Sequence, residues 1–561
     1  MFSGDEKIKK HYLVIFLALI LLTAFFLRSL KLNDSFFDEN EAYNLSDIYG
    51  YVKALKALPL ISDGKKKEYF EFISAINEKS EIGLPLLHPA FTSLPTRPGY
   101  PAIVAVTSCL TGFNDTIGKH VNSILGVVSI LIVFLFGTKL YSVRAGLIGA
   151  LLLTFSLYHI AFSRSGLDHI LTSLCVTASF YFHYLSVKSN KLHSIFLSGI
   201  FFGYAICSHI VSISFLPILL FLEFLLILSN KKFADSLFRL TVLFVGLALP
   251  LFAFQSLSLL IETHQKTGYT FLTGLWAYLT YNVGSPEKYY SYTQPLNFLI
   301  FYIDSESAIS FALIAAWILT FLRKNSFSSL ISKLRKFDIN ITEYYLEIIL
   351  VLYAIIWLHG SITNANHYPP RAFMYCITFF CLWLGGIYNS LLERHKKEFI
   401  AFLLVIFVMT QAARCWKIIV FQSGYREAAD YVLNNSEKPG ICTISDRSIY
   451  KYYIKDVIIR RPKRAADLLK FNQNDGVKYF IAEWNAQWFS NTKNDFYEFE
   501  KEHTPEKIVE NPYYGYLPYM AQAYCYPLDY LSMLKKPGKI QTLRIYNLDR
   551  IFAAEKDRIP E

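Results

Sequence analysis

Residues 119–138 read KHVNSILGVVSILIVFLFGT, and no Asp, Glu, Lys or Arg follows Lys119 in this stretch. Twenty helical residues rise about 30 Å, the thickness of the hydrocarbon core of a bilayer. Similar apolar stretches recur at residues 12–32, 99–113, 145–162, 167–187, 192–208, 210–229, 237–261, 306–322, 344–360, 372–391 and 400–419. The sequence therefore predicts an α-helical polytopic membrane protein.

The overall composition agrees with a membrane protein. The 561 residues are 53% hydrophobic and only 18% charged, whereas about a quarter of a soluble chain is charged. The net charge of +11 is first explained by basic cytoplasmic loops, and no nucleic-acid-binding motif is found. We expect a cytoplasmic-membrane protein that binds membrane lipid and no nucleic acid.

Basic residues predict the orientation of the chain. They gather in five connections, at 139–144, 188–191, 231–239, 323–336 and 394–397, which the positive-inside rule places in the cytoplasm together with the N-terminus. Twelve crossings would return the C-terminus to the cytoplasm, but these charges leave it outside. Because residues 99–113 are too few for a comfortable span, we expect about eleven crossings and an extracytoplasmic C-terminus.

Two domains are expected. Residues 1–422 form the transmembrane domain, with a long first outer loop at 33–98, and residues 423–561 form a small α/β domain. Helical spacing after Asp38 predicts an amphipathic helix on the membrane surface, and Tyr69–Ile76 can form a second. In the C-terminal domain a helix is expected at Tyr425–Leu433. Strands are expected at Ile441–Ile444, Val457–Ile459, Tyr479–Ala482 and Gln541–Tyr546. Cys442 and Cys525 can form a disulfide or remain two thiols.

Two adjacent carboxylates open the outer loop, in Phe36-Phe37-Asp38-Glu39-Asn40-Glu41. Carboxylates outside a helix can deprotonate a hydroxyl or hold a divalent metal, although the sequence does not predict a metal. Alternatively, Asp38 and Glu41 form a capping box for the following helix.

Several cations are expected on the same side of the membrane. Arg97, Arg164 and Arg371 each lie where an apolar stretch begins or ends, and a guanidinium suits a phosphate because it donates two parallel hydrogen bonds. Arg97 can instead be an interfacial anchor, and Arg164 can pair with Asp168 or reach lipid headgroups. His209 and His367 are supporting candidates, and a lone histidine such as His209 is often a packing residue.

The order of these motifs resembles the GT-C glycosyltransferases, in the branch of protein O-mannosyltransferases and lipid A aminoarabinose transferases. The resemblance spans about residues 12–420 and rests on Leu27-Arg28-Ser29-Leu30, Phe37-Asp38-Glu39, the Pro-rich stretch 97–101, Leu125-Gly126-Val127-Val128, Ser163-Arg164 with Asp168, and Arg371.

The resemblance implies an inverting transfer of a sugar from a polyprenyl-phosphate donor to a protein, lipid or glycan acceptor at the outer face. It implies Asp38 as the catalytic base and Arg97, Arg164 and Arg371 as ligands of the donor phosphate. Glu39 and Asp168 would orient partners.

The alternative from another class is a transporter of lipid-linked or small polar substrates. Such folds usually show repeats and polar residues at mid-membrane, which we do not find in the sequence. A lipid-linked polymerase or ligase is a third possibility.

Overall fold

The computed structural model describes residues 4–32, 39–65, 67–69, 71, 97–229, 233–265, 270–276, 306, 310, 314, 318, 341–342, 344–363, 374–394, 397–420, 424–437, 440–443, 447–454, 457–482, 493–510 and 542–556. The chain divides into two compact units. The first contains residues 1–32, 91–112 and 117–419, and the second contains residues 33–90, 113–116 and 420–561.

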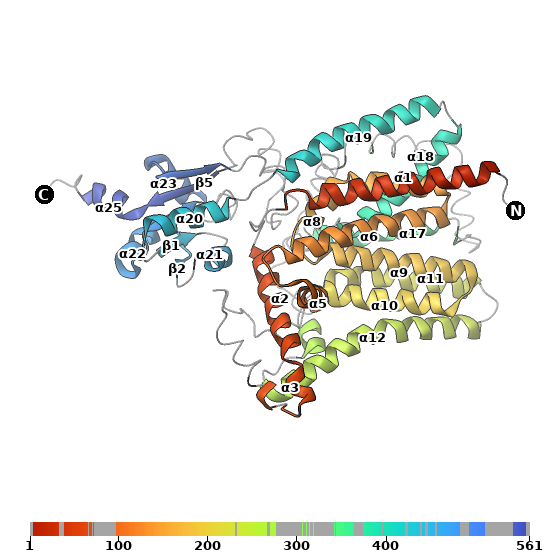
Figure 1. Cartoon of the computed structure of the whole chain (residues 1–561), viewed down its shortest axis with the longest axis horizontal. Helices are drawn as coiled ribbons and strands as arrows, with labels where there is room; N and C mark the ends of the chain where they lie inside the picture. The colour runs from red at the N-terminus through yellow and green to blue at the C-terminus, as the bar shows by residue number, and fades with distance from the viewer. Residues whose placement is uncertain are drawn as a thin grey trace. The chain divides into compact units, whose positions relative to one another are not determined.

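The first unit is a bundle of helices that run side by side (Figure 1). They are α1 (Gly4–Ser29), α5 (Gly99–Thr111), α6 (Ile117–Leu140), α7 (Val143–Thr154), α8 (Leu157–Ser163), α9 (His169–Ser189), α10 (Leu192–Ser208), the 3₁₀ helix η1 (Ile210–Phe215), α11 (Leu216–Ser229), α12 (Phe233–Gln265), α17 (Tyr345–Thr363), α18 (Ile377–Arg394) and α19 (Lys397–Ile419).

Six stretches of the described chain are long and apolar enough to cross a membrane, or seven if α7 and α8, bent by 62°, form one span. The prediction of eleven crossings is therefore not confirmed. The helices α5, α10, α17 and α18 are apolar but short, and most of residues 306–322 lie outside the described residues. With 13 residues, α5 rises only about 20 Å, which explains why 99–113 was the doubtful span.

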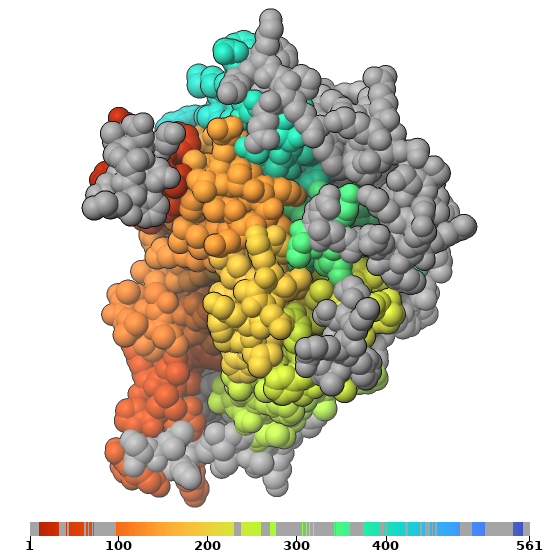
Figure 2. Space-filling view, turned by 90° about the vertical axis from the view of Figure 1, so that its right-hand side faces the viewer, coloured from red at the N-terminus to blue at the C-terminus, as the bar shows by residue number. Residues whose placement is uncertain are grey.

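Glycines allow the closest helix contacts of the bundle. A Cβ atom added to Gly203 in α10 would lie 2.2 Å from the carbonyl oxygen of Leu247 in α12, and one added to Gly199 would lie 2.2 Å from that of Leu243. Such small-residue seams bring helix backbones together in a membrane. Figure 2 looks onto the ends of the helices, where atoms of α6 (orange), α9 and α10 (yellow) and α12 (yellow-green) lie next to one another.

The second unit contains a five-stranded sheet in the order β2-β1-β3-β5-β4. The strands are β1 (Gly440–Thr443), β2 (Ile458–Arg460), β3 (Tyr479–Ala482), β4 (Lys507–Glu510) and β5 (Thr542–Asn547). The strands β1, β2 and β3 are parallel, and β5 is antiparallel to β3 and β4. The four predicted strands are confirmed within one or two residues, and β4 was missed.

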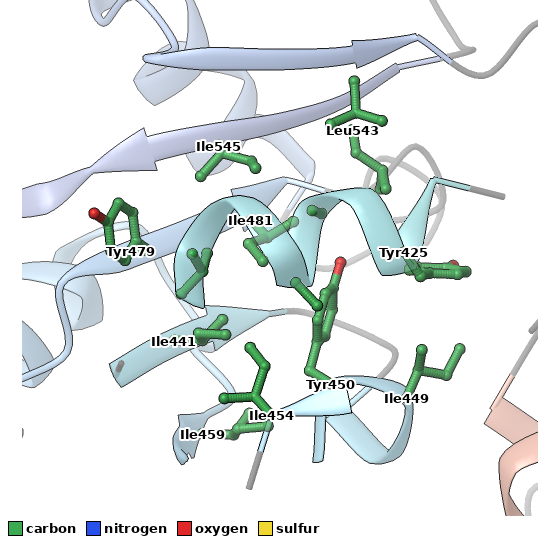
Figure 3. Packing of buried hydrophobic residues seen from close by; sticks show 14 of the residues in the cluster. Tyr425, Ile441, Ile449, Tyr450, Ile454, Ile459, Tyr479, Ile481, Leu543 and Ile545 are labelled. Atoms are coloured by element: carbon green, nitrogen blue, oxygen red, sulfur yellow. The ribbon is translucent and has the colours of Figure 1, made fainter. Parts of the chain in front are cut away.

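Helices cover both faces of this sheet, because its strands alternate buried side chains between them. Ile441 and Ile481 face the core formed with α20 (Tyr425–Asn435) and α21 (Arg447–Tyr453), shown in Figure 3. Cys442 and Phe480 face the core formed with α22 (Ala466–Asp475), α23 (Lys493–Glu502) and α25 (Leu548–Lys556). Burial raises the pKa of the Cys442 thiol to about 12, and Cys525 lies outside the described residues.

The connection between α1 and α5 also contributes α2 (Glu39–Ala57) and the short α3 (Pro59–Ser62) to the second unit. The predicted helix after Asp38 is therefore confirmed, but its predicted place on the membrane surface is wrong. The side chains of Leu45, Ile48 and Val52 are at most 3% exposed, and polar Glu41 and Ser46 are buried as well. Of the second predicted helix, Tyr69–Ile76, only Tyr69 and Glu71 are described.

Candidate functional site

A cluster of buried polar side chains lies where α9 begins. Asp168 precedes α9, and its carboxylate makes no hydrogen bond to the helix N-terminus. Its Oδ1 lies 3.0 Å from Nδ1 of His169, and its Oδ2 lies 3.6 Å from Nη1 of Arg97. The His209 ring lies 5.2 Å from that of His169, centroid to centroid. The fold thus brings together Arg97, Asp168 and His209, which are far apart in the sequence.

Breaks between helices place these four residues. Arg97 lies two residues before α5, and His209 separates α10 from η1, where its Nδ1 accepts a hydrogen bond from the amide of Val211. Asn122 of α6 donates to the carbonyl oxygens of Ser165 and Leu167, at 2.7 and 2.6 Å. These bonds fix the turn that leads to Asp168.

Aromatic rings hold His169 in one orientation. Its imidazole stacks on Phe162, with a centroid distance of 4.9 Å, and on Tyr375, at 5.7 Å and nearly parallel. His169 and Asp168 are each only 1% exposed. A buried carboxylate is costly unless cations accompany it, and Arg97 favours its ionised form. The cluster therefore combines one negative charge with three groups that can bind a phosphate.

The same residues can hold a metal ion. One ligand atom from each of Asp168, His169 and His209 lies within 4.8 Å of the other two. One carboxylate and two imidazoles are a donor set that divalent transition metals accept, leaving positions open for substrate oxygen atoms. The donor set therefore fits a divalent cation.

Arg164 lies apart from this cluster. It is 2% exposed, and its two terminal nitrogens donate to carbonyl oxygens of Leu27, Arg28, Leu30, Lys31 and Ile419, at 2.8–3.3 Å. These oxygens include the unpaired acceptors at the C-terminal end of α1. The contacts favour a structural role over the expected phosphate ligand, and neither a turn pair with Asp168 nor a reach to headgroups describes them.

Arg28 plays a similar part at the bend between α7 and α8. It is fully buried and donates to the carbonyl oxygens of Leu153 and Thr154, in the last turn of α7. Its Nη2 also lies 2.8 Å from Nδ1 of His159. The sequence pointed to Arg28 only as part of a motif and did not reveal its partners.

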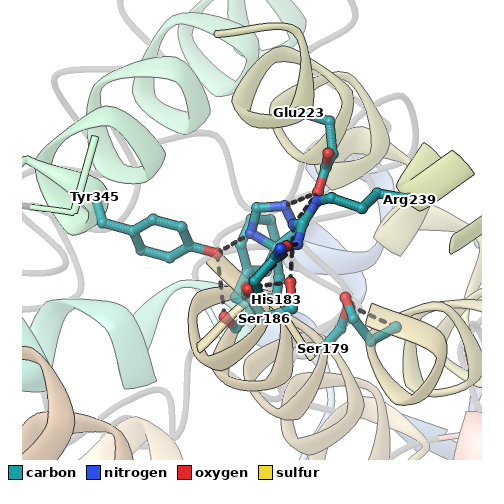
Figure 4. A network of polar contacts seen from close by, with 9 residues as sticks. Ser179, His183, Ser186, Glu223, Arg239 and Tyr345 are labelled. Carbon is teal, nitrogen blue, oxygen red and sulfur yellow. Dashed lines mark hydrogen bonds and ion pairs between the residues drawn. The ribbon is translucent and has the colours of Figure 1, made fainter. Parts of the chain in front are cut away.

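A second buried polar network was missed entirely (Figure 4). Glu223 of α11 lies 2.9 Å from Nε2 of His183 in α9 and 3.0 Å from Nη2 of Arg239 in α12. The His183 Nδ1 lies 2.7 Å from the hydroxyl of Tyr345 in α17. His183 is roughly 22 Å from Asp168 along α9. We expected the polar residues to lie at one edge of the membrane, and this network shows that they are not confined to it.

The remaining predicted site residues are not placed. Asp38, His367 and Arg371 lie outside the described residues. Glu39 begins α2, but its side chain is not described.

Comparison with known families finds a match to part of the membrane unit. Residues 88–255 match the model of the dolichyl-phosphate-mannose-protein mannosyltransferases. About 30% of the chain is therefore similar to this family of GT-C glycosyltransferases. The matched residues include the Arg97, Asp168, His169 and His209 cluster.

Solved structures of an archaeal oligosaccharyltransferase have a similar fold. The oligosaccharyltransferase of Archaeoglobus fulgidus in the apo form is similar at a TM-score of 0.52 and 13% identity, covering 90% of this chain and 74% of that one. The same enzyme with an inhibitory peptide and a dolichol-phosphate has a TM-score of 0.52 at 12% identity, covering 85% and 70%. ArnT of Cupriavidus metallidurans bound to undecaprenyl phosphate has a TM-score of 0.45 at 14% identity, covering 85% and 94%. No curated protein matches the sequence.

Proposed function

We propose that this glycosyltransferase moves a sugar from a polyprenyl-phosphate donor to a protein, lipid or glycan acceptor at the outer face of the membrane. The observation that carries the proposal is the cluster at the start of α9, in which partly exposed Arg97 meets the buried Asp168, His169 and His209. Dolichol-phosphate in the archaeal enzyme and undecaprenyl phosphate in ArnT support a lipid phosphate as the ligand.

The proposed reaction is a direct displacement. An acceptor oxygen attacks the anomeric carbon, the bond from that carbon to the phosphate oxygen breaks, and the phosphate leaves with the bonding electrons on its lipid. Asp38 takes the proton of an acceptor hydroxyl, with Glu39 beside it in the sequence. Because the new bond forms opposite the leaving phosphate, the anomeric configuration inverts.

Cations stabilise the charge that grows on the departing phosphate, which is often the largest single term in such catalysis. Arg97 supplies one, and we propose that Arg371 supplies another and that His367 supports it. Asp168 keeps Arg97 in place through their 3.6 Å contact. If a divalent cation binds, Asp168, His169 and His209 would hold it, and it would add positive charge at the phosphate.

The test uses the purified enzyme in nanodiscs, labelled polyprenyl-phosphate sugars, and acceptors from the native membrane. We expect Asp38→Asn to lower transfer about 10²–10⁴-fold while binding of the donor stays unchanged. Asp63→Asn, an exposed residue of the same loop, is the matched control and should retain full activity. Full turnover by Asp38→Asn would remove Asp38 from the mechanism, and no transfer by the unmodified enzyme from any such donor would overturn the function.

A second measurement, of donor binding, tests the role of Arg97 separately from that of Asp38. We expect Arg97→Gln to weaken binding of polyprenyl phosphate as well as transfer, because its guanidinium faces the ligand and not the acceptor. An Arg97→Gln enzyme with unchanged binding and turnover would exclude this cluster from the donor site.

A further inference from the structure

Tyr375, two residues before α18, lies against both imidazoles of the cluster at the start of α9. Its ring is nearly parallel to that of His169, at a centroid distance of 5.7 Å, and tilted by 48° to that of His209, at 5.6 Å. Because the two imidazoles are themselves 5.2 Å apart, the three rings form a closed triangle. Aromatic pairs attract one another at such distances, so each ring limits the rotation of the other two.

The backbone on either side of this tyrosine is attached to α9. The Ser173 hydroxyl donates to the carbonyl oxygen of Met374 at 3.1 Å, and the hydroxyl oxygens of Thr177 and Thr378 lie 2.6 Å apart. Ser173 and Thr177 follow His169 by four and eight positions and therefore share its face of the helix. The helix that begins with His169 thus also holds the segment that carries the tyrosine.

The packing around the triangle keeps its rings in place. The side chains of Tyr375 and His169 are each 1% exposed, and Phe162 stacks on the other side of His169 at 4.9 Å. In a close-packed interior a ring confined on both sides has no room to change its orientation. The arrangement that His169 and His209 offer to a ligand is therefore set before the ligand binds.

We infer that Tyr375 is a positioning residue of the donor site, which holds His169 and His209 in the arrangement that receives the phosphate of the lipid donor. The inference rests on the proposed function, in which the cluster around Asp168 binds that phosphate. A side chain that is already oriented loses less conformational entropy when it binds its ligand. Tyr375 acts through the two imidazoles, and its role requires no contact of its own with the ligand.

The test is Tyr375→Leu in the full-length protein in nanodiscs, with the affinity for labelled polyprenyl phosphate as the readout. Leucine keeps an apolar side chain but removes the ring, so both imidazoles must be ordered when the ligand binds. Ordering one side chain weakens binding about two- to tenfold, and we expect the dissociation constant to rise about tenfold for the pair. Tyr375→Phe retains the ring and should bind normally.

Tyr388→Leu is the matched control. Tyr388 is a fully buried tyrosine of the same helix, about 16 Å beyond the start of α18. Its substitution should lower the melting temperature about as much as Tyr375→Leu does, while the affinity stays within about twofold of normal. A role in folding alone would lower the melting temperature of both variants and change the affinity of neither.

A second variant keeps the test decisive if Tyr375→Leu does not fold. Ser173→Ala combined with Thr177→Val leaves all three rings in place, but it removes both hydroxyl contacts that attach the tyrosine segment to α9. We expect this double variant to fold and its dissociation constant to rise about threefold, because the ring is held less firmly. Unchanged affinity of the double variant, where Tyr375→Leu is not folded, would contradict the positioning role.

Other results would also overturn the inference. These are normal affinity of folded Tyr375→Leu, equal losses in Tyr375→Leu and Tyr388→Leu, or equal losses in Tyr375→Leu and Tyr375→Phe, which would show that the hydroxyl itself meets the ligand. If Arg97→Gln binds weakly and Tyr375→Leu binds normally, the donor site stands and the positioning role fails. If the unmodified protein binds no polyprenyl phosphate, the proposed function fails and the inference fails with it.

Discussion

Substitution of Arg164 tests whether this residue binds the donor phosphate or stabilises the fold. The guanidinium donates to five carbonyl oxygens, and the shortest contacts are 2.8 Å to Leu30 and 3.0 Å to Lys31. A hydrogen bond to a charged group contributes about 1.5–3 kcal/mol, so these two alone contribute about 3–6 kcal/mol. Arg164→Met keeps much of the side-chain volume but removes every donor.

The loss can be expressed as a melting temperature. With an unfolding entropy of about 2.1 cal/mol/K per residue over the roughly 360 residues of the membrane unit, 3–6 kcal/mol corresponds to a fall of about 4–8 °C. The assay is thermal unfolding of the purified enzyme in detergent, followed by intrinsic fluorescence. Affinity for labelled polyprenyl phosphate is measured at a temperature where the variant is folded.

The structural interpretation requires a lower melting temperature and unchanged affinity for polyprenyl phosphate. Arg144→Met removes an exposed arginine near the start of α7 and should change neither quantity. If Arg164→Met melts like the unmodified enzyme but binds polyprenyl phosphate at least tenfold more weakly, Arg164 is a phosphate ligand and our reasoning is wrong.

Two further predictions concern the packing of the membrane unit. Glu223→Ala should destabilise the unit by about 3–5 kcal/mol because it leaves Arg239 buried without its carboxylate. The double variant Glu223→Ala, Arg239→Met should recover part of that loss, and additive losses in thermal unfolding would contradict the coupling. Gly203→Val should abolish the monodisperse peak in size-exclusion chromatography, because its Cβ would lie 2.2 Å from the Leu247 carbonyl oxygen. The control Phe201→Val, at a half-buried neighbour in α10, should retain that peak. A normal elution profile for Gly203→Val would show that α10 and α12 can separate without cost.

The positions of helices and strands followed largely from local pattern. Stretches such as 119–138 and 400–419 are apolar enough to predict α6 and α19 from hydropathy alone. The strand at 479–482 was predicted with its observed bounds, since its four residues are uniformly suited to a buried strand. The number of membrane crossings could not be predicted from local pattern. Length and composition do not distinguish a short apolar helix inside a bundle from a helix that spans the membrane.

The surroundings of α2 could not be predicted. Its spacing of apolar residues gave the helix, but spacing is identical for a helix on a bilayer and one packed in a protein core. The helix packs against α21, hundreds of positions later in the chain, and Leu45 belongs to the same core as Ile449 and Tyr450. Only the tertiary structure therefore decided that this part of the connection between α1 and α5 belongs with the C-terminal domain.

The sequence by itself determined where charges interrupt apolar stretches, and so identified Arg97, Arg164, Asp168 and His209 as unusual. It did not determine their partners. A buried polar group must find a hydrogen bond or an opposite charge, but any helix that approaches can supply it. The fold joined Asp168 to Arg97 and His169, and gave Arg164 the carbonyl oxygens at the end of α1. Which groups meet depends on helix packing, which local sequence does not encode.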